Sequence, residues 1–284
     1  MQHRITINLH GGKSGTAPSA FPVKHVRGDV SGWTPKSARG NTEFLQSVEY
    51  GGLSGLGLAF TGTIKDCPSS PDDWHKMRLS FVHRLRRLGL LRFHWVTEWQ
   101  RRGVPHLHGM FFFPDCAGSD YVALVSAVRD AWLSLSAPYG GLSRGVHIVP
   151  MTDARGWAEY EAKHASRGCN HYQRSKDNIP TQWQTKTGRV WGKGGEWPVQ
   201  SAMTFEASGA VFWRFRRLIR SWRISEARSS GKPRRIVYAR KSLKCNNAKL
   251  SAVRGTNDWI PHTHSMALMH ASAVLTSGAL NQIK

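Results

Sequence analysis

The sequence predicts an α+β fold, in which a central antiparallel sheet carries a His-x-His strand, helices flank the sheet, and a basic extension follows at the C-terminal end. Three observations lead to this prediction. Runs with strand character alternate with runs of helical periodicity and include a hairpin signal, which is typical of helices packed on an antiparallel sheet. Two histidines, His106 and His108, lie one residue apart within a strand-like run. From Arg214 to Lys244 the chain is rich in arginine and lysine, and Glu226 is the only acidic residue.

The first part of the chain has little periodicity and one clear strand. Residues 1 to about 50 are punctuated by Gly, Ser and Thr, so we expect a partly irregular N-terminal segment. The run Leu56–Ile64 predicts a strand on which Thr61 and Thr63 share one face, because alternate strand residues point the same way.

A helix is predicted next, beginning at Pro71. Asp72 and Asp73 suit its first turn, Arg86 and Arg87 suit its last turn, and Gly89 suits its end. The residues expected on its buried stripe are apolar ones at helical spacing: Trp74, Met77, Leu79, Phe81, Val82, Leu85 and Leu88.

The segment 92–113 predicts a β-hairpin, because strand-like alternation lies on both sides of the five-residue loop RRGVP. Helices are predicted at about 121–135 and 152–167, with a short strand, GVHIVPM, between them. Thr152 or Asp153 is the expected N-cap of the second of these helices.

The composition indicates an anionic partner. Lys and Arg number 40 against 18 Asp and Glu, which gives a formal net charge of +22 and favours nucleic acid as the partner. Twelve tryptophans could serve as platforms for unpaired bases, although core packing is the alternative for each of them. We find no apolar run long enough to span a bilayer and no secretory signal at the start, and the four scattered cysteines fit a reducing cytoplasm.

His106-Leu107-His108 is the first candidate for chemistry. On a strand, both imidazoles point to one face and Leu107 points to the opposite core. With the hairpin centred on Gly103, Glu98 would face His108, and Gln100 would face His106. Two imidazoles and one carboxylate form an open site that suits Mg²⁺ or Mn²⁺, although imidazoles also accept Zn²⁺. The alternative is an incidental pattern, as we assume for His262-Thr263-His264.

The predicted helix at 152–167 carries the second candidate. Tyr160, Lys163, His164 and Arg167 lie at helical spacings that line one face. A phenol attacks only when its oxygen is deprotonated or stabilised by nearby cations or a metal, and Lys163 and Arg167 could supply that charge. The alternative is a solvated helix face.

Together these motifs resemble the HUH endonucleases (His-hydrophobic-His), in particular the replication initiators of rolling-circle plasmids and single-stranded DNA phages. The resemblance covers about residues 56–197 and rests on three motifs in order. They are Phe60-Thr61-Gly62-Thr63 as a degenerate first motif, Glu98 followed by His106-Leu107-His108, and Tyr160-Glu161-Ala162-Lys163. The strand VHIVPM and Gly188-Arg189-Val190-Trp191-Gly192 are also similar to the family pattern.

The resemblance implies an HUH/RRM-like palm and metal-dependent, sequence-specific nicking and joining of single-stranded DNA. His106, His108 and Glu98 would hold Mg²⁺ or Mn²⁺. Tyr160 would attack the scissile phosphate to form a 5′-phosphotyrosine, with Lys163 positioning the phosphate. His164 stands where two-tyrosine phage enzymes often repeat the tyrosine, which implies a single-tyrosine member; Tyr172 is the second candidate nucleophile.

The expected organisation is an N-terminal segment at 1–50, an endonuclease domain at 51–200, a basic DNA-binding helical extension at 201–245 and a flexible tail at 246–284. The residues expected to contact DNA combine arginines with an aromatic ring: Arg167, Arg189, Trp191, Arg214, Arg216, Arg217 and Arg220. Within 213–224, Trp213, Phe215 and Trp222 are further candidate stacking platforms. The alternative is an amphipathic helix with Leu218 and Ile219 packed inward.

The partners that the resemblance implies are a single-stranded DNA origin (a stem-loop or nick site) and the host helicase and polymerase, with no membrane. The expected place of action is the cytoplasm of a bacterial host. Two other functions stay open. One is a single-tyrosine transposase or small relaxase, which keeps the chemistry. The other is a DNA-binding protein or repressor in which the histidines are structural.

Overall fold

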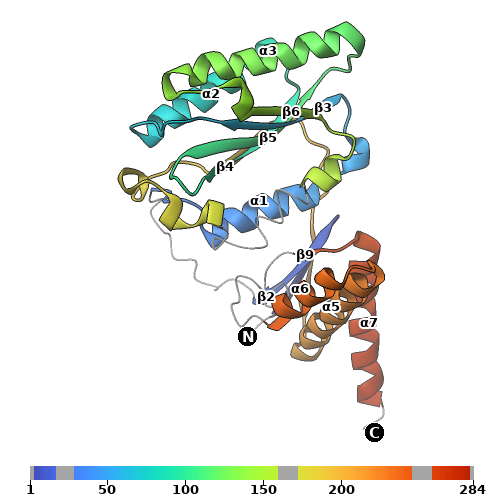
Figure 1. The fold of residues 1–284 in the computed structure, drawn as a ribbon. Helices are drawn as coiled ribbons and strands as arrows, with labels where there is room; N and C mark the ends of the chain where they lie inside the picture. Colours follow the sequence, from blue (N-terminus) through green and yellow to red (C-terminus); the bar gives the residue numbers. More distant parts are fainter. Residues whose placement is uncertain (1–2, 17–28, 159–171, 245–257, 282–284) are drawn as a thin grey trace. The chain divides into compact units, whose positions relative to one another are not determined.

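The computed structural model describes residues 3–16, 29–158, 172–244 and 258–281 (Figure 1). The chain forms two compact units. The larger unit comprises Val26–Asn41 and Tyr50–Pro198, and the smaller comprises Met1–His25, Thr42–Glu49 and Val199–Lys284. In the described residues, no helix is both long and apolar enough to cross a membrane.

The larger unit is built on a five-stranded antiparallel sheet whose strand order is β6-β3-β5-β4-β7. The strand with the His-x-His motif, β5, is the middle strand of this sheet. The predicted fold class is therefore confirmed. The strands are β3 (Leu56–Thr63), β4 (Arg92–Trp99), β5 (Pro105–Phe113), β6 (Val146–Pro150) and β7 (Trp191–Gly195).

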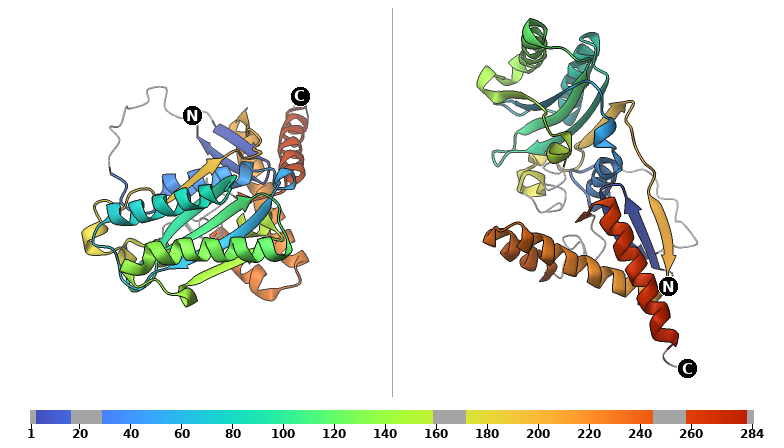
Figure 2. Two further views of the ribbon diagram at one scale, coloured as in Figure 1. Left: turned by 90° about the horizontal axis from the view of Figure 1, so that it is seen from above. Right: turned by 90° about the vertical axis from the view of Figure 1, so that its right-hand side faces the viewer.

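Two helices, α2 (Pro71–Arg87) and α3 (Gly118–Ser136), lie side by side on one face of this sheet (Figures 1 and 2). An aromatic cluster joins them to the strands, with ring centroids 5.0–5.8 Å apart in mostly edge-to-face pairs. Its members are Phe60, Phe81, Phe111 and Trp132, each fully buried. Gly62 leaves room for this cluster, because a Cβ there would lie 2.5 Å from the Trp132 ring.

Helix α2 forms where the sequence predicts it. Ser70 caps it by accepting the Asp73 backbone N–H, Pro71 fills the first turn, and Gly89 follows its end with a φ of +87°. The predicted stripe is wrong at two positions, since Leu79 and Leu88 are 43% and 37% exposed. Leu79 lies off the 74-77-81-85 row, and Leu88 lies at the C-cap. Arg78 takes a buried place instead.

The predicted hairpin is present, but its register differs by two residues from the prediction. The loop runs from Gln100 to Val104, closed by backbone hydrogen bonds from Gln100 N–H to Val104 O (2.9 Å) and from Gly103 N–H to Gln100 O (2.9 Å). Gly103 lies off the centre of this loop, in the left-handed region with φ +79°. Glu98 therefore pairs with His106, not with His108. A shift of two residues preserves the face of every side chain, so the carboxylate still faces the imidazoles.

The strand after α3 agrees with prediction, and the following helix begins at residue 154 and is described as far as 158. Residues 159–171 lie outside the described part of the chain. The remaining short elements of this unit are 3₁₀ turns: Tyr50–Gly52, Ala137–Tyr139, Ser143–Gly145, Tyr172–Arg174 (η5), Lys176–Asn178 and Thr181–Trp183.

The smaller unit contains a four-stranded antiparallel sheet with the order β8-β1-β2-β9. Its strands are β1 (His3–Asn8), β2 (Gly11–Thr16), β8 (Met203–Ala207) and β9 (Asp258–Trp259). Its helices are α5 (Gly209–Ser229), α6 (Pro233–Lys244) and α7 (His262–Asn281), of which α5 packs against both α6 and α7 (Figure 2). Helix α1 (Pro35–Ser47) contributes residues to both units.

Both ends of the chain are more regular than the sequence indicates. Strand β1 lies in the segment expected to be partly irregular, and α7 lies in the expected flexible tail. Ile5 and Ile7 are buried against Phe212 and Phe215 of α5, with Met266, Leu268 and Met269 of α7 packed around them. Neither end has a strong pattern by itself, and contacts between residues distant in sequence stabilise both.

The aromatic cluster provides a test of the α2 face. We expect Phe81→Ala to lower the free energy of unfolding by about 3–5 kcal/mol, because it leaves a cavity among four rings. Leu79→Ala on the exposed side should cost less than about 1 kcal/mol. Urea unfolding followed by circular dichroism measures both. Equal losses of unfolding free energy in the two variants would contradict the observed orientation of α2.

Candidate active site

One face of the five-stranded sheet gathers the candidate residues, and it is the face away from α2 and α3. Leu107 is fully buried in the core beneath those helices, so its neighbours His106 and His108 point to the other face. The pairing of β3 with β5 places Thr61 opposite His108 and Thr63 opposite His106. The predicted face of both threonines is confirmed.

Glu98, His106 and His108 converge as the sequence predicts. One potential ligand atom from each residue lies within 4.8 Å of the others. His108 Nε2 is 3.9 Å from Glu98 Oε2, and the two imidazole rings are 4.6 Å apart at a steep angle. Glu98 and His106 are buried, while His108 is partly open to solvent. The three side chains thus form a compact donor set with one more accessible member.

Thr61 orients His108. Its Oγ1 lies 2.9 Å from His108 Nδ1 and can accept the Nδ1–H proton. That hydrogen bond favours the tautomer whose Nε2 lone pair faces the Glu98 carboxylate. A histidine that binds a metal commonly donates its other ring N–H in this way. The degenerate first motif therefore contributes a side chain to the site.

Arg174 forms an ion pair with the Glu98 carboxylate. It was not among the residues predicted from the sequence. This buried arginine on η5 donates from Nε to Glu98 Oε1 at 2.5 Å, and its guanidinium lies 3.9 Å from the centroid of the Trp33 ring. The ion pair occupies Oε1 and leaves Oε2 directed toward His108. Arg174 is 76 residues from Glu98 in the chain, and no local pattern marks the pair.

Two more side chains at the site carried no signal in the sequence. Gln173 Nε2 lies 3.3 Å from His106 Nε2. His147 of β6 pairs with Thr61 and is exposed on the same face. The strand order brings β6 beside β3, and tertiary packing brings η5 against β4, so spacing along the chain could not have identified either residue.

Burial and positive neighbours lower the pKa of His108 and of His94. The pKa of His108 is lowered mainly by burial; Glu98 raises it and Arg174 lowers it further. His94, on the same face of β4, has its pKa lowered to about 3 by burial and then by Arg174 and Lys193. Its Nε2 lies 2.6 Å from Asn41 Oδ1 and donates to it. Neutral imidazoles have the lone pairs that metal binding requires.

The donor set fits a divalent cation. Two imidazoles and one carboxylate oxygen leave coordination positions for water or a phosphate oxygen, and the hydrogen bonds of Thr61 and Arg174 hold two of the three ligands in place. Glu98, His106 and His108 are the residues that could hold such an ion.

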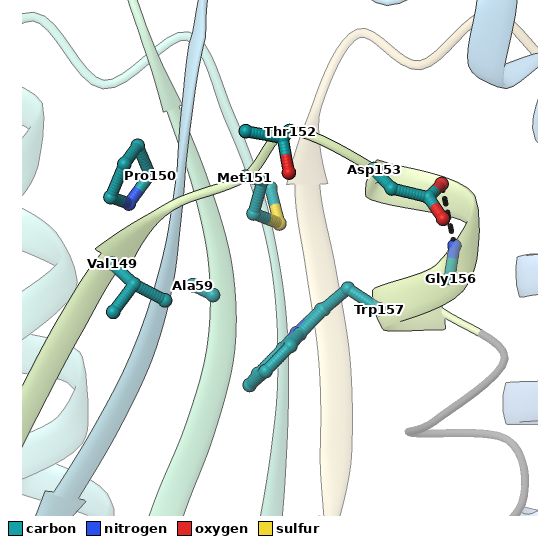
Figure 3. A pocket seen from close by; sticks show the side chains of 8 residues that line it. All are labelled: Ala59, Val149, Pro150, Met151, Thr152, Asp153, Gly156 and Trp157. Atoms are coloured by element: carbon teal, nitrogen blue, oxygen red, sulfur yellow. Dashed lines mark hydrogen bonds between the residues drawn. The ribbon is translucent and has the colours of Figure 1, made fainter.

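A pocket of about 340 Å³ lies beside this site on the same face (Figure 3). Ala59 of β3 is two residues from Thr61 and pairs with Val149 of β6, so both point to the face of the triad. Trp157 lies across the pocket from them, as Figure 3 shows, and Asp153 accepts the Gly156 N–H at 2.9 Å. The other residues lining the pocket are Pro150, Met151 and Thr152. The walls are mainly apolar and suit a flat, uncharged group.

The predicted catalytic helix is only partly described. Tyr160, Lys163, His164 and Arg167 lie outside the described residues, so no geometry is stated for them. The second candidate nucleophile, Tyr172, is exposed, and Arg101 lies 5.2 Å above its ring.

The other expected DNA contacts are divided between the two units. In the larger unit Arg189 is exposed, and Trp191 is partly buried with its ring 6.2 Å from that of His94. On α5, Arg217 and Arg220 are exposed, whereas Arg214 and Arg216 are partly buried. The surroundings of the rings on α5 differ. Trp213 is 51% exposed beneath Arg216, but Phe215 is fully buried in the core and is not available for stacking.

Comparison with known proteins identifies relatives along most of the chain. The chain is 45% identical over 264 residues to the replication-associated protein of Pseudomonas phage Pf3, covering 92% of this chain and 94% of that protein. Two proteins of Xylella fastidiosa, provisionally described as replication proteins, are also similar. The one from strain 9a5c is 45% identical over 90% of this chain and 92% of its own length. The one from strain Temecula1 is 43% identical over 90% and 98%. No family model and no solved structure matches.

Titration of His94 should be visible in the stability of the protein. Because its pKa falls from 6.5 to about 3 on folding, the unfolded chain binds the additional proton below pH 6.5. The contribution of His94 to the free energy of unfolding is therefore fully present above pH 6.5 and is lost progressively toward pH 3. The slope from this group is at most about 1.4 kcal/mol per pH unit. Urea unfolding at several pH values should show a shallower slope for His94→Gln. An unchanged slope would exclude His94 as the source.

Proposed function

This chain belongs to the family of replication proteins that includes the replication-associated protein of Pseudomonas phage Pf3, and we propose that it initiates rolling-circle replication as a single-tyrosine HUH endonuclease. In this proposal the protein nicks and rejoins single-stranded DNA at an origin. In the cytoplasm of a bacterial cell, the host polymerase then extends the free 3′ end while the host helicase unwinds the duplex.

The observation that carries this proposal is the donor set on the open face of the sheet. Glu98, His106 and His108 lie within 4.8 Å of one another and are oriented by Thr61 and Arg174. A DNA-binding protein with merely structural histidines would have no need to hold two imidazoles and a carboxylate together in this way. Bound Mg²⁺ or Mn²⁺ would supply Lewis-acid polarisation of the scissile phosphate.

The remaining steps belong to side chains of this protein. The Tyr160 hydroxyl loses its proton and its oxygen bonds to phosphorus, while the bond from phosphorus to the 3′ oxygen breaks and that oxygen takes up a proton. The products are a 5′-phosphotyrosine and a free 3′-hydroxyl. Because the phosphodiester energy is kept in the tyrosyl ester, a later 3′-hydroxyl can reverse the step and rejoin the strand. Lys163 and Arg167 position the phosphate and stabilise the phenolate.

Each of the two units offers surfaces that support a single strand as the substrate. The pocket formed with Trp157 lies on the triad face and has the apolar walls that an unstacked base prefers. On α5, Trp213 with Arg216 above it, together with Arg217 and Arg220, offers a stacking surface and charges for flanking phosphates.

Replacement of the nucleophile is the most direct test. Single-stranded oligonucleotides tiling the genetic element that carries the gene would be incubated with the protein and Mn²⁺. We expect wild-type protein to form a covalent DNA adduct whose peptide mass maps to Tyr160. Tyr160→Phe should abolish both adduct and cleavage, by at least about a thousandfold. Tyr172→Phe is the matched control and should keep both. Cleavage that survives Tyr160→Phe but not Tyr172→Phe would move the nucleophile to Tyr172.

Metal binding can be tested without DNA. Calorimetric titration with Mn²⁺ should give one site in wild-type protein that is lost in His106→Gln and in Glu98→Gln. Thr61→Val removes only the orienting hydrogen bond and should weaken Mn²⁺ binding by roughly tenfold to a hundredfold. His83→Gln, an exposed histidine of α2 on the other face of the sheet, is the control and should bind normally. Cleavage that persists in excess EDTA would contradict the metal assignment.

A further inference from the structure

Arg78 is a buried cation on the opposite face of the sheet from the triad. It lies on α2, is 6% exposed, and stacks with its guanidinium carbon 3.4 Å from the centroid of the Trp95 ring. Its Nη2 donates to His75 Nδ1 at 2.7 Å, and its buried Nε has no hydrogen-bond partner among the described residues. Trp95 and Glu98 point to opposite faces because they are three residues apart on β4.

The nearest charges do not compensate Arg78. In the part of the chain that the structure describes, no carboxylate forms an ion pair with it. Burial lowers the pKa of Arg78 to about 9, and the charge that adds to this effect is another cation, Arg189. The guanidinium is still protonated at neutral pH. Burial lowers the pKa of His75, Arg78 and Arg189 lower it further, and Asp72 partly opposes them.

The contrast with Arg174 shows what is missing. These two are the buried arginines of the described chain, and each stacks on a tryptophan. Arg174 donates to Glu98 at 2.5 Å, whereas Arg78 has no acidic partner within the described ranges. A buried charge is stable when an opposite charge and hydrogen bonds replace its lost hydration. The surroundings of Arg78 therefore lack an anion.

We propose that Arg78, Arg189 and His75 form a binding site for a phosphate group, with nucleic acid as its carrier. His75 contributes a second kind of donor. Its Nδ1 accepts from Arg78, so in the neutral ring Nε2 carries the hydrogen and can donate to a phosphate oxygen. Both His75 and Arg189 are exposed, so the site is open to a ligand from solvent.

The position of the site suits a strand that continues past the active site. Arg189 comes shortly before β7, which is the edge strand next to β4, and the N–H of Thr97 on β4 donates to Val190 O at 2.7 Å. A nucleic acid chain leaving the triad face can pass this edge and place a phosphate by Arg78. The identity of the carrier rests on the proposed function, but the phosphate site itself does not.

Binding at several salt concentrations tests the site. The probe is oligothymidylate, and all proteins carry Tyr160→Phe to exclude covalent capture. Arg189→Gln and Arg78→Met should each weaken binding roughly tenfold at low salt, because each removes one charge-assisted hydrogen bond to the phosphate. Each should also reduce the slope of log K against log salt by about 0.7. Met retains the length that covers Trp95, and Arg78→Lys should bind better than Arg78→Met.

The matched control is Arg87→Gln. Arg87 is exposed on the same helix, nine residues beyond Arg78 and thus about half a turn around its axis. The Arg87→Gln substitution removes one positive charge, as the other two variants do, but it should leave the slope of log K against log salt nearly unchanged. If all three variants have the same slope, the phosphate site is wrong even though nucleic acid binds. Thermal unfolding of each variant without ligand shows whether the fold persists, and Arg189→Gln, a surface change, keeps the test valid if Arg78→Met unfolds.

Inorganic phosphate separates the two sources of the ligand. If wild-type protein binds no oligothymidylate, nucleic acid is excluded as the carrier, and a rise in melting temperature with phosphate that disappears in Arg189→Gln would support a free phosphate as the ligand. The proposed function is judged separately, by the covalent adduct at Tyr160. If substitution of Arg78 or Arg189 changes neither oligothymidylate binding nor the effect of phosphate on the melting temperature, the inference is overturned, and Arg78 only packs on Trp95.

Discussion

The alignment of three neighbouring strands is the constraint on which the site depends. Glu98 of β4, His106 and His108 of β5 and Thr61 of β3 share a face only because the β3–β5 and β4–β5 pairings are both in register. A slip of one residue in either pairing would turn one set of side chains into the aromatic core. That core, with Phe60, Phe111 and Leu107 beneath α2 and α3, is also what makes such a slip costly. Packing on one face therefore holds the chemistry on the other.

A buried ion pair completes the site from outside the hairpin. Arg174 neutralises Glu98, which would otherwise be a costly buried charge, and it selects which carboxylate oxygen faces the histidines. Burial lowers the pKa of His94 and His108, and the positive charge of Arg174 lowers both further. One side chain thus influences the geometry and the protonation of the donor set. Arg78 also stacks on a tryptophan, Trp95, but it lacks such a partner among the described residues.

Much of the larger unit could be predicted from local pattern. Helix α2 has a proline, acidic residues and a glycine at the expected ends, and the hairpin has alternation on both sides of a short loop. The errors have physical causes. Leu79 was expected to be buried because it is apolar, but its angle around the helix places it in solvent while Arg78 packs on a ring. Loop composition does not determine which residue lies at the centre of a five-residue loop, so the predicted register differed by two residues.

The sequence by itself determined the α+β class, the hairpin and the candidate triad, because these follow from periods of two and 3.6 residues and from residue chemistry at short spacing. Only the tertiary structure decided that Thr61 orients His108, that Arg174 pairs with Glu98, and that the two ends of the chain form one unit with β8 and α5. These contacts join residues 47, 76 and some 200 positions apart. Local pattern carries no information about such pairs, since strand order and core packing alone bring them together.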